Sequence, residues 1–122
     1  MLKIYLTIEE MIYLIKNISL QLNNSSFDPD VIISINRGGC IPGIYLSHYL
    51  DKPHEVIKIE LRDSKLKPDL ISITEKIKKF NSVLIIDDIN DSGSTIGIIK
   101  DLGNNLTTKI HFAVLINKSE SK

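Results

Sequence analysis

Residues 83–95 of this chain are Val83-Leu84-Ile85-Ile86-Asp87-Asp88-Ile89-Asn90-Asp91-Ser92-Gly93-Ser94-Thr95. The aliphatic residues at the start predict a buried strand, and this strand runs into two adjacent acids. A short loop with a third acid follows, and Ser94 opens a predicted helix. This order predicts carboxylates and free backbone N–H groups together at the end of one strand.

Asp87 and Asp88 are the more informative part of this stretch. Two neighbouring carboxylates at the end of a buried strand repel each other and need cations or hydrogen-bond donors. A diol supplies two hydroxyl donors, and Mg²⁺ can bridge sugar oxygens to a carboxylate. The alternative is a solvated acidic turn. The apolar strand before the acids and the loop after them favour a binding site.

The loop residues Ser92-Gly93-Ser94-Thr95 lie where the helix begins. Free N–H groups and the helix dipole favour a phosphate at such a position. Three hydroxyls can add hydrogen bonds, and Gly93 lets the backbone approach a ligand closely. Taken alone, these four residues fit a simple helix N-cap slightly better, so the phosphate interpretation depends on the neighbouring acids.

A second strand–loop–helix unit lies earlier in the chain. Residues 31–35 form a β-branched run that leads into Asn36-Arg37-Gly38-Gly39-Cys40-Ile41-Pro42-Gly43. Open parallel sheets bind ligands in loops of this kind, at the carboxyl ends of strands. An arginine beside exposed N–H groups suits a pyrophosphate. Glycine loops after strands are common, however, and Arg37 could simply pair with an acid.

Strands and helices alternate along the rest of the sequence. Expected strands cover residues 31–35, 54–61, 70–73, 83–86 and 110–116, the second of them nearer an edge and the last one buried. A capping box of Thr7 and Glu10 starts the first helix, and Gly103 is expected in the left-handed conformation that ends the last one. The alternation predicts one α/β domain over residues 1–122 with a mainly parallel sheet.

The composition excludes several classes of protein. The chain has 15 basic and 15 acidic residues, so its net charge of zero provides no overall field for nucleic acid or an anionic membrane. Cys40 is the only cysteine, which excludes an intrachain disulfide and a cysteine-based metal site. The sequence has no apolar run that could span a bilayer and no signal-peptide features, so we expect a soluble cytoplasmic protein.

The two loops together resemble those of the type I phosphoribosyltransferases. The signature of that family is an aliphatic run, two acids, two variable residues and then Asp-Thr/Ser-Gly-Gly/Ser/Ala-Thr. Residues 83–95 match every fixed position, with Ser92 where threonine is more usual. Within the family the chain is most similar to the small bacterial xanthine–guanine (6-oxopurine) enzymes, through the segments Ser34–Gly43 and His111–Lys118.

The resemblance implies the fold and the donor site of this family. The fold would be a mainly parallel, twisted sheet flanked by helices on both faces. Asp87 and Asp88 would hold the ribose 2′- and 3′-hydroxyls of phosphoribosyl pyrophosphate, partly through Mg²⁺. The loop Ser92-Gly93-Ser94-Thr95 would cradle the 5-phosphate, and Arg37-Gly38-Gly39 would bind pyrophosphate.

The resemblance also implies an acceptor site and a reaction. Asp91 would lie near purine N7 and assist proton transfer, with Arg37 as the second catalytic residue, and Lys118 would face the exocyclic oxygen of a 6-oxopurine. The polar residues 62–69 match the mobile lid that closes over the reaction. The implied activity is Mg²⁺-dependent transfer of 5-phosphoribose to guanine, xanthine or hypoxanthine in purine salvage. A homo-oligomer, dimer or tetramer, is expected.

The sequence departs from the family at three places. Asn36 replaces a small residue before Arg37, and the predicted lid is short and has no aromatic residue. The third departure is a missing C-terminal hood, since the chain stops four residues after Lys118 where these enzymes continue. The N-terminal segment, a neighbouring subunit or a partner would then complete the base pocket. The alternative function is a catalytically silent regulator that binds phosphoribosyl pyrophosphate or a nucleotide.

Overall fold

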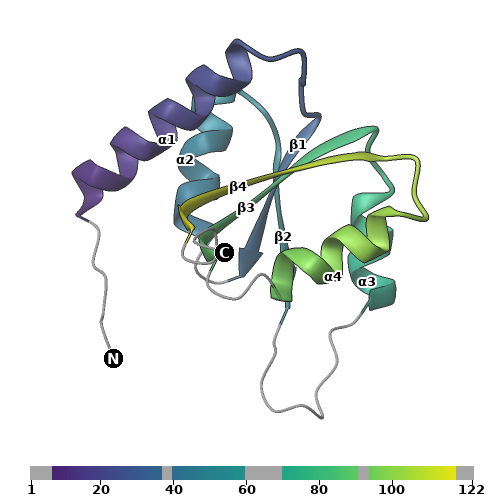
Figure 1. Ribbon diagram of the computed structural model, residues 1–122. Coiled ribbons are helices and arrows are strands. Elements are labelled where there is room, and N and C mark those ends of the chain that lie inside the picture. The colour runs from purple at the N-terminus through teal and green to yellow at the C-terminus, as the bar shows by residue number, and fades with distance from the viewer. Residues whose placement is uncertain (1–6, 37–39, 60–69, 91–93, 118–122) are drawn as a thin grey trace, which may run out of the picture.

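The computed structural model describes residues 7–36, 40–59, 70–90 and 94–117. Four parallel strands form one sheet with helices on both faces (Figure 1). The elements in chain order are α1 (Ile8–Asn23), β1 (Val31–Asn36), α2 (Cys40–Leu50), β2 (His54–Lys58), α3 (Leu70–Ile77), β3 (Ser82–Asn90), α4 (Ser94–Gly103) and β4 (Lys109–Asn117). The strand order is β2-β1-β3-β4. The predicted α/β fold class is confirmed.

The two faces of the sheet carry separate apolar clusters, because successive strand residues point to opposite faces. On one face, β1 and β3 pack with Ile73 and Ile77 of α3 and Ile99 of α4. On the other face, they pack with Ile15 of α1 and Leu46 of α2. The central strands are therefore buried on both sides, which explains their continuous runs of valine, leucine and isoleucine.

The N-terminus of α1 confirms the predicted capping box. The Thr7 hydroxyl accepts a hydrogen bond from the Glu10 backbone N–H at 3.0 Å, and the Thr7 N–H donates to Glu10 Oε1 at 2.9 Å. Both side chains thus satisfy backbone N–H groups at the open end of the helix. None of the helices among the described residues is long and apolar enough to cross a membrane.

The prediction of a strand at residues 70–73 is wrong. This segment is the first turn of α3, which spans Leu70–Ile77. Its decisive residues are Ile73 and Ile77, which lie four positions apart and are both buried against the sheet. A short apolar run fits either a strand or a buried helix face, and only the packing partner distinguishes them.

Three further expectations need correction. Gly103 was expected after the end of α4 in the left-handed conformation, but it is the last residue of the helix. An added Cβ would lie 2.9 Å from Ile110 Cδ1, so close packing explains the glycine. Strand β4 is only half-buried, because it forms an edge of the described sheet. Strand β3 continues beyond Ile86 to Asn90, because its ladder with β4 extends that far. The edge position expected for β2 is confirmed.

Candidate active site

After β1 the chain adds strand β2 on one side of β1, and it then returns to add β3 and β4 on the other side. From β1 it crosses to β2 through α2 on one face, and from β3 it crosses to β4 through α4 on the opposite face. Figure 1 shows α2 and α4 starting near the carboxyl ends of β1 and β3. In open parallel sheets such a switch point opens a crevice outside the carboxyl ends of the strands, where ligands bind.

Both predicted anion-binding loops follow the strands that flank this switch point. The connection from β1 to α2 consists of residues 37–39, and the connection from β3 to α4 consists of residues 91–93. The residues that flank these connections, Asn36 and Cys40 for the first and Asn90 and Ser94 for the second, belong to the described part of the chain. The carboxyl ends of β1 and β3, after which the two connections follow, lie at one edge of the sheet because these strands are parallel neighbours.

The register of the strands places the acids beside the start of the first loop. Ser34 on β1 is level with Ile86 on β3, so two residues further along Asn36 is level with Asp88. Strands β3 and β4 continue to the pair Asn90 and Asn117, two residues beyond this level. At about 3.3 Å per residue, β3 therefore ends roughly 7 Å further out than β1.

Asp87 and Asp88 are residues of β3. The sequence had suggested that this strand ends at Ile86 and that both acids follow it. Asp87 is half-buried and level with Val114 on β4. It has the same strand parity as Val83 and Ile85, which places it on the sheet face that α4 covers. The β3–β4 ladder holds the backbone of both acids, so the carboxylates are attached to a rigid element.

The N-terminus of α4 provides the second part of the site. The helix begins at Ser94 and spans ten residues. The N–H groups of its first turn have no partner within the helix, and the helix dipole adds a partial positive charge. Ser94 and Thr95 thus lie on a helix end at the carboxyl edge of the sheet, as an anion site requires.

Several predicted site residues lie outside the described residues. These are Arg37, Gly38, Gly39, Asp91, Ser92, Gly93 and Lys118, and the predicted lid at residues 62–69 also lies outside them. Their attachment points are nevertheless known. Lys118 follows Asn117, the last residue of β4, and Asn117 pairs with Asn90 at the end of β3. All of these predicted residues connect to the same edge of the sheet.

The acids also suit a divalent cation chemically. Asp87 and Asp88 are adjacent carboxylates at a strand end, and hard oxygen ligands of this type are those that Mg²⁺ prefers. Mg²⁺ commonly takes one or two protein carboxylates and obtains its other ligands from water and substrate phosphates. Because consecutive strand residues point to opposite faces of the sheet, the acids fit a cation that takes one protein carboxylate and is shared with a phosphorylated substrate.

One polar pair was not recognised as such from the sequence. Ser34 is fully buried in β1, and its hydroxyl oxygen lies 2.6 Å from Nε2 of His54 on β2. His54 was expected to be a surface or cap residue. The only signal was a serine within an otherwise apolar strand. Because this pair joins the central strand β1 to the start of the edge strand β2, it supports the site's scaffold rather than the site itself.

The sequence of residues 1–122 matches the family model described as phosphoribosyl transferase domain. The chain belongs to the phosphoribosyltransferase family. It is accordingly a phosphoribosyltransferase, and the type I core predicted from the two loops is confirmed. A search of curated protein sequences returned no match.

Several solved structures have the same fold as this chain. A purine phosphoribosyltransferase from Pyrococcus horikoshii is 29% identical, with a TM-score of 0.73, and the match covers 96% of this chain and 78% of that chain. A hypothetical protein from Neisseria gonorrhoeae with bound ppGpp is 24% identical, with a TM-score of 0.72 and coverages of 93% and 70%. A hypoxanthine-guanine phosphoribosyltransferase from Bacillus anthracis is 20% identical, with a TM-score of 0.67 and coverages of 95% and 71%.

Proposed function

We propose that this phosphoribosyltransferase transfers 5-phosphoribose from phosphoribosyl pyrophosphate to a 6-oxopurine base and releases pyrophosphate. The observation that carries this proposal is the convergence of two three-residue connections, after β1 and after β3, at the switch point of the sheet. In the order of the chain, the acids of β3 lie between these two connections. A substrate with a diol between two phosphorylated ends matches this order of groups.

Each half of the donor has an assigned partner in this proposal. Asp87 and Asp88 accept hydrogen bonds from the ribose 2′- and 3′-hydroxyls, and the loop Ser92–Thr95 holds the 5-phosphate at the N-terminus of α4. Arg37-Gly38-Gly39, in the connection that follows β1, holds the pyrophosphate. Because β1 and β3 are parallel neighbours, the elements that carry the two anion-binding segments start from the same edge of the sheet.

The chemistry of the transfer assigns the remaining roles. Breaking the bond between ribose C1 and pyrophosphate builds negative charge on the leaving group, and the Arg37 guanidinium stabilises that charge. A bound Mg²⁺, held by Asp87 and Asp88, would supply further positive charge to the sugar and the pyrophosphate. Asp91 assists removal of the proton from the base as the new C–N bond forms, and Lys118 recognises the oxygen at position 6.

The purine class is supported by the named relatives. The Pyrococcus horikoshii protein, at 29% identity, is a purine phosphoribosyltransferase. Other proteins of this fold include an adenine enzyme from Saccharomyces cerevisiae and a xanthine-guanine-hypoxanthine enzyme from Helicobacter pylori. Lys118 favours a 6-oxo group over a 6-amino group, because an ammonium donates hydrogen bonds and cannot accept them.

The test is a screen of bases with purified protein, phosphoribosyl pyrophosphate and Mg²⁺. We expect pyrophosphate release with guanine, xanthine or hypoxanthine, and little with adenine. Calorimetry with phosphoribosyl pyrophosphate alone is measured in parallel. Tight binding without turnover on any base would overturn the proposed transfer and leave the regulatory alternative. Turnover on adenine alone would overturn the 6-oxopurine assignment.

A further inference from the structure

Strand β2 ends in a lysine beside the strand that precedes Arg37. Lys58 is the last residue of β2, and it pairs with Asn36, the last residue of β1. The other two strands end in Asn90 and Asn117, so Lys58 is the one charged residue among the four strand ends of the described sheet. The four-carbon stem of a lysine can span the roughly 4.8 Å between neighbouring strands. The ammonium group of Lys58 can therefore reach the end of β1.

The strand pattern places Lys58 on the face of the sheet that carries α2. Ile57, one residue earlier, is buried in the apolar cluster on the side of α3 and α4. Because successive strand residues point to opposite faces, Lys58 belongs to the side of α1 and α2. The residue is exposed there. A charged side chain accessible to solvent thus lies on the same face as the helix that follows β1.

The start of α2 lies at about the same level along the strands as Lys58. Gly43 of α2 lies against Ser34 of β1, since a Cβ at this glycine would overlap with the Ser34 hydroxyl. Helix α2 runs opposite to the strands, so its first residue, Cys40, lies roughly 5 Å nearer the carboxyl edge than Gly43. Asn36 and its partner Lys58 lie two residues, or roughly 7 Å, beyond the level of Ser34.

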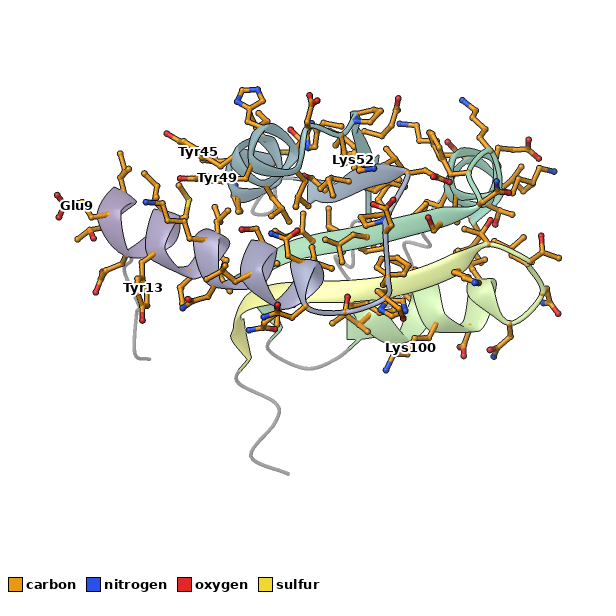
Figure 2. The ribbon with its side chains drawn as sticks, turned by 90° about the horizontal axis from the view of Figure 1, so that it is seen from above. Glu9, Tyr13, Tyr45, Tyr49, Lys52 and Lys100 are labelled. Atoms are coloured by element: carbon orange, nitrogen blue, oxygen red, sulfur yellow. The ribbon has the colours of Figure 1, made fainter. Side chains whose placement is uncertain are left out.

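Helix α2 has a start that suits an anion. It spans 11 residues and contains no acidic side chain, and its first N–H groups have no partner within the helix. Figure 2 shows Tyr45 and Tyr49 on the side of α2 that faces away from the strands. The other side carries Gly43 and packs closely on the sheet, so the helix start is held near the ends of β1 and β2.

An anion bound at this edge needs positive charge. Asp87 and Asp88 on β3 bring two negative charges, and a pyrophosphate group brings several more. The sequence contains only two arginines, Arg37 and Arg62. Lys58 lies on the other side of β1 from the acids, because the strand order is β2-β1-β3. It can therefore add positive charge to a ligand that the acids approach from the opposite side.

We propose that the Lys58 ammonium binds the pyrophosphate group of phosphoribosyl pyrophosphate, together with the first N–H groups of α2. This inference rests on the proposed function, which assigns pyrophosphate to the connection between β1 and α2. Lys58 donates charge-assisted hydrogen bonds to phosphate oxygens. Negative charge on the pyrophosphate grows as its bond to ribose C1 breaks, so the contact strengthens in the transition state. Lys58 thus acts in donor binding and in departure of the leaving group.

Calorimetry of the full chain with inorganic pyrophosphate and Mg²⁺ tests the contact without turnover. We expect Lys58→Met, which removes the charge and keeps an unbranched side chain, to weaken pyrophosphate binding about tenfold or more. Lys58→Arg keeps the charge and should retain most of the affinity. The matched control is Lys79→Met, because Lys79 is also exposed and lies between α3 and the start of β3, at the other edge of the sheet. This control should bind pyrophosphate like wild type.

A second ligand separates a contact with pyrophosphate from a general effect on the fold. Ribose 5-phosphate carries the 5-phosphate of the donor but no pyrophosphate. Its affinity should be the same in wild type and Lys58→Met, whereas a disturbed sheet edge would weaken the binding of both ligands. Thermal unfolding establishes that each variant is folded. If Lys58→Met does not fold, Lys58→Gln provides a second variant without charge.

The outcomes that overturn the proposal are specific. Wild-type affinity for pyrophosphate in Lys58→Met excludes the contact and leaves Lys58 as a solvated residue at a strand end. Equal losses for pyrophosphate and ribose 5-phosphate indicate a structural role instead. A wild-type chain that does not bind pyrophosphate also contradicts the proposal. A chain that binds pyrophosphate through Lys58 but transfers no phosphoribose to any base supports this inference and contradicts only the proposed transfer.

Discussion

The buried hydroxyl oxygen of Ser34 on β1 lies 2.6 Å from Nε2 of His54 on β2, directly beneath Gly43 of α2. This contact joins a central strand, an edge strand and a helix at one point. Nε2 can accept a hydrogen bond from the hydroxyl, and a protonated Nε2–H can donate one to the hydroxyl oxygen. His54 and residue 43 both lie against the Ser34 hydroxyl, so changes at either position act on the same contact.

His54 should make stability depend on pH. Burial lowers the pKa of His54 below its usual value of 6.5, with His48 adding to the decrease and Glu55 opposing it. Near pH 6 the unfolded chain then binds a proton at this residue and the folded chain does not. The free energy of unfolding should therefore fall as the pH drops from about 6.5 toward the lowered pKa of the folded state.

The measurement is chemical unfolding of wild type and His54→Gln at several pH values between about 5 and 8. The difference between the two proteins isolates His54 from the other titrating groups. We expect the variant to lose this part of the pH dependence and His48→Gln to retain it. Parallel curves for wild type and His54→Gln would contradict the assignment.

Gly43→Ala should destabilise the protein by overpacking. A Cβ at this position would overlap with Ser34 Oγ and would lie 2.9 Å from His54 Nε2. Overpacking of this kind typically costs about 1–3 kcal/mol, and the hydroxyl cannot move away because Ser34 is fully buried. Denaturant unfolding of the single variant gives the cost directly.

A double mutant tests whether the contact with Ser34 is the cause. Ser34→Ala removes the hydroxyl, which is the nearest group, and leaves Ser34 Cβ at 3.1 Å from the added methyl group. The double variant should therefore be less destabilised than the sum of the two single variants. The matched control is Gly97→Ala, where an added Cβ meets nothing within 4 Å. Simple additivity at positions 34 and 43 would exclude a direct clash.

Asp30→Ala should weaken the hydrogen bonds that connect the starts of β1 and β3, at the end of the sheet opposite the site. Asp30 Oδ2 accepts hydrogen bonds from the backbone N–H groups of Asn81 at 3.1 Å and Ser82 at 3.2 Å. Losing these charge-assisted bonds should cost about 1–2 kcal/mol in the free energy of unfolding. Asp28→Ala is the control, because Asp28 is exposed and its ion pair with Lys52 should contribute under about 1 kcal/mol. Equal costs for both variants would contradict a specific role of Asp30.

The acids of β3 should be required for donor binding. The double variant Asp87→Asn with Asp88→Asn keeps the size of both side chains and removes their charge. We expect binding of phosphoribosyl pyrophosphate in the presence of Mg²⁺ to weaken at least tenfold, because each lost charge-assisted hydrogen bond is worth about 1.5–3 kcal/mol. Asp101→Asn on the exposed side of α4 should bind like wild type. Unchanged affinity in the double variant would contradict both the enzyme and the regulatory interpretation.

The sequence was most informative where local chemistry decides the structure. The aliphatic runs of β1 and β3 and the capping box at Thr7 and Glu10 were all predicted correctly. Residues 83–95 also identified the family before any fold was known. These features depend on neighbours in the chain, whose side chains and backbone groups interact at short sequence separation.

The tertiary structure decided what depends on distant partners. Residues 70–73 became helical because Ile73 and Ile77 pack together on the sheet, and the acids became strand residues because β4 pairs with β3 as far as Asn90. The contact between Ser34 and His54 likewise arises between segments far apart in the chain. The sequence by itself thus determined the central strands, the start of α1 and the residue types of the loops. Only the packed sheet decided the register that brings those loops together, because register depends on which strands pair and at what level.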